Sequence, residues 1–212
     1  MPEKIFTIPL NEAFDEKEGC PLCRLRDKLE EQTLEAALGA AMMEPSVRIE
    51  MNKEGFCHPH LDEVAALLDT PVAGGKKGLF SKKSEDTDAA EAVTEQLKSC
   101  YVCRRIKSTE RRYASNAAWL WESDPAFREK LKAQPYFCLS HTALLLRAGK
   151  QELKEKDYAT LYEALTQVTK SALTALRQDV TAFTVSFDHR NAGKPLSDEQ
   201  RTSLERAVTM LK

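Results

Sequence analysis

Six cysteines and four histidines are the residues of this chain whose types and spacing could do chemistry. They are Cys20, Cys23, Cys57, Cys100, Cys103, Cys138, His58, His60, His141 and His189. Four of the cysteines form two Cys-x-x-Cys pairs. The other two, Cys57 and Cys138, are each followed three residues later by a histidine. Zinc takes four tetrahedral ligands from Cys and His side chains, and three cysteines with one histidine form a common structural set. The pattern therefore predicts two zinc ions per chain.

The ligand sets follow from an internal repeat, in which three short segments recur about 80 residues later. Segment 20–23 recurs as 100–103, 44–48 as 124–128, and 55–60 as 136–141. The repeat pairs His60 with His141 and pairs His58 with a leucine, which favours His60 as the ligand. Each copy is expected to hold its own ion. The predicted sets are Cys20, Cys23, Cys57 and His60, and Cys100, Cys103, Cys138 and His141. The sequence leaves open an exchange of Cys-x-x-Cys pairs between the copies.

Two other chemistries fit some of these residues. An iron–sulfur cluster would also be held by cysteine thiolates. A redox-active dithiol fits Cys20-Pro-Leu-Cys23 by spacing, but no strand–helix–strand pattern surrounds it. Four protein ligands close a zinc site and leave no open position for water or substrate. The sequence therefore favours structural zinc and a non-enzymatic protein over catalysis.

Helices must position these residues, because the apolar periodicity is helical nearly throughout. The expected helices cover 21–38, 101–121, 61–68, 142–148 and 157–187, and a capping box at Ser197–Gln200 opens a last helix that ends near Leu211. Strand patterns are weak and confined to Ile5–Ile8 and Val47–Met51. The predicted fold class is all-α, with two repeated metal-stapled units, a long C-terminal helix and a short final helix.

The segment from Thr70 to Ala90 divides the repeat copies. It contains three glycines, a lysine cluster and an acidic run, which is typical of a linker. We therefore expect a first metal-binding unit at 1–69, a linker at 70–90, a second unit at 91–150, and C-terminal helices at 151–212 that pack on both units.

Composition excludes some classes of protein. Apolar residues make up 42% and charged residues 30% of the chain, as in ordinary globular proteins, and the net charge is −2. This balance argues against nucleic-acid binding, despite a basic stretch from Arg104 to Arg112. No apolar run reaches transmembrane length, and the first residues lack the features of a signal peptide. We therefore expect a cytoplasmic protein with reduced cysteines and no membrane association.

The combined motifs resemble a bacterial family known only as a domain of unknown function. The resemblance rests on an Ile-x-Thr-Ile-Pro start at residues 5–9, Glu12-Ala-Phe14, the Cys-x-x-Cys and Phe-Cys-x-x-His segments, and a closing Phe187-Asp-His-Arg-Asn191. It spans nearly the whole chain and implies no activity. Some members are labelled ABC transporter substrate-binding proteins, a label that this N-terminus does not support.

A candidate binding surface lies outside the repeat, at Asp188, Arg190 and Asn191, with Glu12 as an expected neighbour. Arg190 could form a two-point ion pair with Glu12, as a clasp between the chain ends, or with a carboxylate on a partner. The leading hypothesis is a zinc-binding helical protein that binds a protein or small-molecule partner. The alternatives are a thiol-redox or metal-responsive protein, and a nucleic-acid-binding module.

Overall fold

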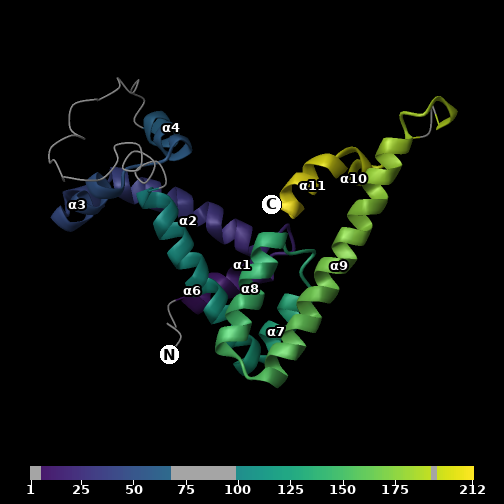
Figure 1. Ribbon diagram of the computed structural model, residues 1–212, viewed down its shortest axis with the longest axis horizontal. Coiled ribbons are helices and arrows are strands. Elements are labelled where there is room, and N and C mark those ends of the chain that lie inside the picture. The colour runs from purple at the N-terminus through teal and green to yellow at the C-terminus, as the bar shows by residue number, and fades with distance from the viewer. Residues whose placement is uncertain (1–5, 68–98, 192–194) are drawn as a thin grey trace, which may run out of the picture. The chain divides into compact units, whose positions relative to one another are not determined.

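A computed structural model describes residues 6–67, 99–191 and 195–212, and every regular element in these ranges is a helix (Figure 1). The elements are α1 (Thr7–Asp15), α2 (Pro21–Leu38), η2 (Ala40–Met43), α3 (Pro45–Glu54), α4 (His58–Leu67), α6 (Tyr101–Ser123), α7 (Pro125–Lys132), α8 (Leu139–Glu152), α9 (Glu155–Val185), η3 (His189–Asn191), α10 (Asp198–Arg201) and α11 (Ser203–Leu211). The all-α prediction is confirmed. The expected linker at 70–90 lies outside the described residues.

The described residues of both segments with a weak strand pattern are helical instead. Helix α1 begins at Thr7 and buries Leu10, Ala13 and Phe14, whose spacing of three and four residues matches one helix face. Helix α3 begins at Pro45, whose fixed φ angle suits the first helical position, and it buries Met51. Packing of one helical face outweighed the β propensity of a few branched residues.

The chain forms two compact units that are not contiguous in sequence. Unit 1 comprises Met1–Arg26 with Glu110–Lys212, and unit 2 comprises Asp27–Thr109. The division falls inside α2 and inside α6, so each unit combines the first turns of one long helix with the last turns of the other. The units cut across the expected segments 1–69 and 91–150, and the sequential domain division stays a prediction.

Unit 1 has an aromatic core. Phe14 on α1 packs against Phe127 on α7 and against Phe137, with ring centroids 4.8 and 6.0 Å apart. Trp121 is buried near the end of α6 and donates its indole N–H to the hydroxyl of Thr160 on α9. These contacts join α1, α6, α7 and α9 around the segment that leads into α8.

Unit 2 has a smaller core, from the end of α2, α3 and the start of α6. Its buried apolar side chains include Leu34, Met51, Tyr101, Val102 and Ile106. The residues 80 positions from Met51 and Val102 in the repeat are Leu131 and Leu22, and both of those are buried in unit 1. The repeat therefore preserves core positions as well as the cysteine and histidine motifs.

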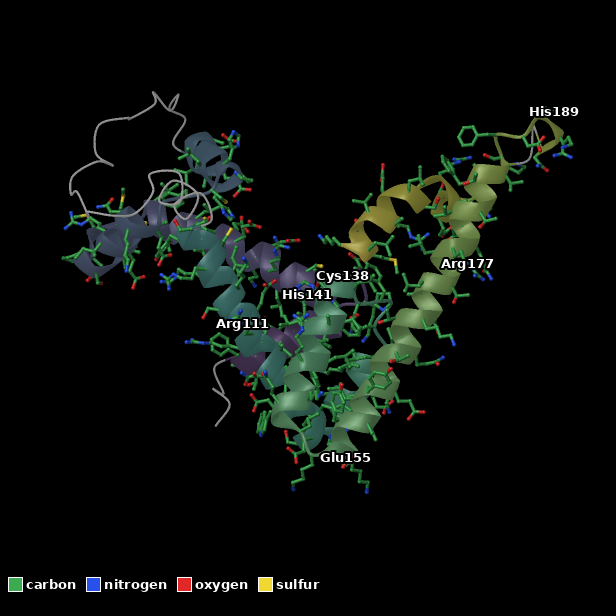
Figure 2. The ribbon with its side chains drawn as sticks, in the orientation of Figure 1. Arg111, Cys138, His141, Glu155, Arg177 and His189 are labelled. Carbon is green, nitrogen blue, oxygen red and sulfur yellow. The ribbon has the colours of Figure 1, made fainter. Side chains whose placement is uncertain are left out.

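Helix α9 is a single helix, as predicted, and its neighbours are α7, α8, α10 and α11. Its apolar stripe is not uniformly buried: Leu161 and Leu165 are fully buried, whereas Phe187, just beyond the helix, is 76% exposed. The stripe loses its cover toward the end of α9, beside the labelled His189 in Figure 2. The predicted capping box at Ser197 is present, but the last helix is broken into α10 and α11.

Candidate metal centres

The eight predicted ligands gather into two clusters, but with the cysteine pairs exchanged. One cluster, the unit 1 cluster, contains Cys20, Cys23, Cys138 and His141. The other, the unit 2 cluster, contains Cys57, His60, Cys100 and Cys103. Each cluster takes its Cys-x-x-Cys from one repeat copy and its Cys-x-x-His from the other. The predicted pairing within each copy is therefore wrong.

Helix length explains the exchange. From Cys103 to Ser123, α6 rises about 30 Å at about 1.5 Å per residue. The return helix α7 has eight residues and recovers only about 12 Å. The Cys-x-x-His that follows α7 therefore stays about two turns along α6 from Cys103, beside Glu110, where the first turn of α2 supplies the partner cysteines. Helices α2 and α3 show the same imbalance of 18 against 10 residues.

All eight side chains lie at helix N-termini. Cys20, Cys57, Cys100 and Cys138 each directly precede a helix, and the second ligand of each pair is the third residue of that helix. The backbone supports this arrangement, since the carbonyl of Cys138 accepts from the N–H of Thr142 at 2.9 Å. Two helix N-termini thus converge on each cluster. Their partial positive charge stabilises thiolates.

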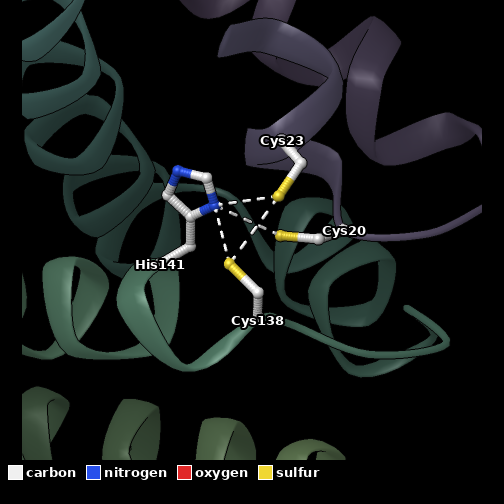
Figure 3. A group of neighbouring side chains, drawn as sticks. All are labelled: Cys20, Cys23, Cys138 and His141. Atoms are coloured by element: carbon white, nitrogen blue, oxygen red, sulfur yellow. Dashed lines mark hydrogen bonds between the residues drawn. The ribbon is translucent and has the colours of Figure 1, made fainter. Parts of the chain in front are cut away.

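The unit 1 cluster has the dimensions of one tetrahedral site. The Nδ1 atom of His141 lies 3.5, 3.3 and 3.1 Å from the sulfurs of Cys20, Cys23 and Cys138, and points toward them in Figure 3. The sulfurs of Cys23 and Cys138 are 3.7 Å apart. A tetrahedral zinc site with bonds of about 2.3 Å to sulfur and about 2.0 Å to nitrogen has edges of about 3.8 Å for S···S and about 3.5 Å for S···N. The residues therefore fit a zinc ion.

The unit 2 cluster has nearly the same dimensions. The Nδ1 atom of His60 lies 3.0, 3.3 and 3.5 Å from the sulfurs of Cys57, Cys100 and Cys103. The sulfurs of Cys57 and Cys103 are 3.8 Å apart. This separation is far above a disulfide bond length of about 2.05 Å, and all six cysteines are free.

The thiols and imidazoles of each cluster are close enough to shift one another's pKa values. Burial raises the pKa of the Cys103 thiol to about 12, helped by the neighbouring Cys100 sulfur. Burial also opposes ionisation of Cys100, but hydrogen bonds from the backbone N–H groups of Cys103 and Cys57 and from His60 lower its pKa to about 7. Burial opposes protonation of His141, but hydrogen bonds to thiols and a carboxylate raise its pKa to about 11. A divalent ion would have to displace protons from the thiols and from the imidazole, because cysteine and histidine bind a metal in their deprotonated forms.

The two clusters differ in solvent exposure. All four residues of the unit 1 cluster are buried, and Cys138 is fully inaccessible. In the unit 2 cluster, His60 and Cys100 are buried, whereas Cys57 and Cys103 are only partly buried. The same set of residues is therefore buried throughout in one unit and partly exposed at two cysteines in the other.

Each cluster histidine has Nδ1 toward the sulfurs and a carboxylate at its other ring nitrogen. Nε2 of His60 lies 2.6 Å from Oε1 of Glu30, and Nε2 of His141 lies 3.1 Å from Oε1 of Glu110. Sequence reasoning missed these glutamates. The signal that could have found them is their spacing, because Glu30 and Glu110 are related by the same 80 residues as the cysteine pairs.

Comparison with protein families identifies the chain. A model described as a family of unknown function (DUF6062) matches residues 1–73 and 67–212. The chain belongs to this family. Its description assigns no activity, and the expected bacterial range and transporter label of its members stay predictions.

Comparison with curated proteins found no match, and comparison with solved structures found none either. Among the helices of the described ranges, none combines the length and the apolar composition that a membrane crossing requires.

Two other groups from the sequence lie outside the clusters. His58 is exposed and pairs with Asp62 four residues later, so the histidine that joins the cluster is His60, as the repeat indicated. Arg104, from the basic stretch, pairs with Glu50 and Glu54 on α3 at 2.9 and 2.6 Å. The charge of this arginine is therefore already paired with carboxylates of a neighbouring helix.

The candidate surface at Asp188, Arg190 and Asn191 forms a local structure. Arg190 pairs with Asp188 through Nε and Nη2, and the Asn191 side chain donates to the carbonyl of Val185. The expected ion pair between Arg190 and Glu12 does not occur among the described contacts, and Glu12 is an exposed residue of α1. Arg190 pairs instead with a carboxylate two residues away, and this local ion pair does not require the two chain ends to meet. Partner binding at this surface stays a prediction.

Proposed function

We propose that this member of the family is a non-enzymatic zinc-binding protein, in which two structural zinc ions hold helices in place for a protein or small-molecule partner. The observation that carries the proposal is the convergence of two helix N-termini on three sulfurs and one imidazole nitrogen at tetrahedral spacing, twice. Four protein donors fill the coordination of zinc, which suits a structural ion.

Zinc suits these donors better than an iron–sulfur cluster does. The four donor atoms of each site lie within 4.8 Å of one another, close enough to share one ion. A multi-iron cluster would hold its thiolates on different irons, and its protein ligands are usually four cysteines. Reduced cysteines also suit the cytoplasm, which the proposal takes as the compartment.

Metal content and unfolding test the proposal together. The full chain, purified and dialysed against zinc-buffered solution, should be colourless and hold two zinc ions. Replacement by cobalt should give the intense near-ultraviolet bands of thiolate-to-cobalt charge transfer. Removal of the metal by a chelator should lower the melting temperature, because zinc binding contributes to folding. A brown protein containing iron, or an unchanged melting temperature after full removal, would overturn the proposal.

A metal-responsive or thiol-redox role is the second candidate, and one observation favours it. Cys57 and Cys103 combine partial exposure with a sulfur separation of 3.8 Å. A hydroperoxide could oxidise these two thiolates to a disulfide, with two protons taken up and two electrons passed to the O–O bond, and the zinc would leave. Mass spectrometry after limited peroxide treatment separates the candidates. A Cys57–Cys103 disulfide with reversible zinc release supports the redox role, and random oxidation of all cysteines rejects it.

A further inference from the structure

The two glutamates beside the histidines have a role that the cysteine motifs do not reveal. We infer that Glu30 and Glu110 are positioning residues, which hold the imidazoles of His60 and His141 with Nδ1 toward the metal. The inference rests on the proposed function, since it assumes that the clusters bind zinc. Substitution of either glutamate should therefore weaken metal binding without removing a ligand.

The geometry at each histidine supports this role. In both clusters Nδ1 faces three sulfurs, so Nε2 is the only ring nitrogen left to donate a hydrogen bond. In both clusters the acceptor is a carboxylate oxygen, Oε1 of Glu30 or Oε1 of Glu110. A carboxylate favours the ring form that carries its proton on Nε2, and this form leaves the Nδ1 lone pair free for a metal.

The surroundings of the carboxylates strengthen the contacts. The side chain of Glu110 is 17% exposed and that of Glu30 is 26% exposed, while both histidine side chains are 6% exposed. Partial burial reduces competition from water, so these contacts are worth more than surface pairs. The shorter and more exposed contact belongs to the unit 2 cluster, whose sulfurs are also the more exposed.

The repeat provides an independent argument. Glu30 and Glu110 occupy equivalent positions, seven residues after Cys23 and Cys103, on the long helices α2 and α6. Each helix therefore begins with thiolates of one cluster and carries, about two turns later, the carboxylate for the histidine of the other. A chance surface ion pair has no reason to recur at this position with the same atoms.

The test uses the full zinc-loaded chain with Glu30→Ala and Glu110→Ala, and with Glu30→Gln and Glu110→Gln as conservative variants. Glu31→Ala and Glu122→Ala are matched controls, because they remove an exposed carboxylate from the same two helices. Zinc affinity is measured by competition with a chromophoric chelator. The histidine tautomers are read from long-range ¹H–¹⁵N spectra.

We expect each alanine variant to lose roughly 10- to 100-fold in zinc affinity at one site only. The Gln variants, which keep a hydrogen-bond acceptor, should recover part of the loss. The spectrum of the affected histidine should show mixed tautomers, a change that general loosening of a helix would not produce. If each variant binds two zinc ions with the affinities of the controls, and its histidines show the same tautomers as in the controls, the inference is overturned. The proposed function would be unaffected by that result. A wild-type chain that binds no zinc would overturn the proposed function as well.

Discussion

The exchanged cysteine pairs can be tested by zinc content in double variants. Cys23→Ser with Cys138→Ser removes two ligands from one cluster, because these sulfurs are 3.7 Å apart beside His141. Cys23→Ser with Cys57→Ser removes one ligand from each cluster. We expect the first double variant to keep one zinc ion and the second to keep none. Pairing within each repeat copy predicts the reverse.

The stability of the variants should follow the same rule. An occupied site stabilises the fold by about 4 kcal/mol when free zinc is held near 1,000 times its dissociation constant. The Cys23/Cys138 double variant should lose this contribution once, so its two substitutions should be far from additive. The Cys23/Cys57 double variant should lose it twice, or about 8 kcal/mol, and many domains would unfold at that cost.

The assay is elemental analysis of protein dialysed at fixed free zinc, with chemical unfolding of the same samples. The single variants are the controls, and each should hold one ion. The exchange would be refuted if the Cys23/Cys138 double variant were empty, or if the Cys23/Cys57 double variant kept one ion. Additive stability losses for Cys23 and Cys138 would also contradict a shared ion.

Three further predictions concern single features. Limited alkylation of zinc-loaded protein should modify Cys57 and Cys103 before the other cysteines, and peptide mass spectrometry showing equal rates would contradict the difference in exposure. Gly149→Ala should lower the free energy of unfolding by about 1 kcal/mol or more, since a Cβ there would lie 2.6 Å from Cδ2 of buried Leu161, and thermal unfolding that matches wild type would mean that Leu161 moves aside. Arg190→Ala should leave the melting temperature unchanged, because its ion pair is local and exposed, and a clear decrease would restore the clasp between chain ends.

The helices were predictable because their apolar periodicity and end signals agree. The helix expected at 21–38 is α2 residue for residue, and the capping box at Ser197 is present. The weak strands at Ile5–Ile8 and Val47–Met51 failed because a few branched residues carry little information against a buried helical face. The break between α10 and α11 has no glycine or proline to mark it in the sequence.

The sequence predicted which residues form the clusters, but not which Cys-x-x-Cys pair lies beside which Cys-x-x-His pair. Cysteine and histidine spacing identified all eight cluster residues, because ligand chemistry is local to each Cys-x-x-Cys and Cys-x-x-His turn. Which turn meets which depends on helix lengths and on the antiparallel course of the chain. Glu30 and Glu110 were missed for a similar reason, since a glutamate on a charged helix looks like any solvated residue until its neighbour is known.

Loop entropy favours closure within each repeat copy only slightly. Closure within the first copy would join Cys23 to Cys57, which are 34 positions apart in the sequence. Closure within the second copy would join Cys103 to Cys138, which are 35 positions apart. The observed sites are nested instead: His60 and Cys100 are 40 apart, whereas Cys23 and Cys138 are 115 apart. Once the inner site has formed, the outer loop shortens to about 75 residues, and the nested arrangement costs only about 0.8 kcal/mol more loop entropy. Breaking α6 to return Cys138 to Cys103 would forfeit several backbone hydrogen bonds and a buried face, at a cost well above that figure. The intact long helices therefore decide the pairing, and shortening them, rather than altering the ligands, is the change that would restore pairing within each copy.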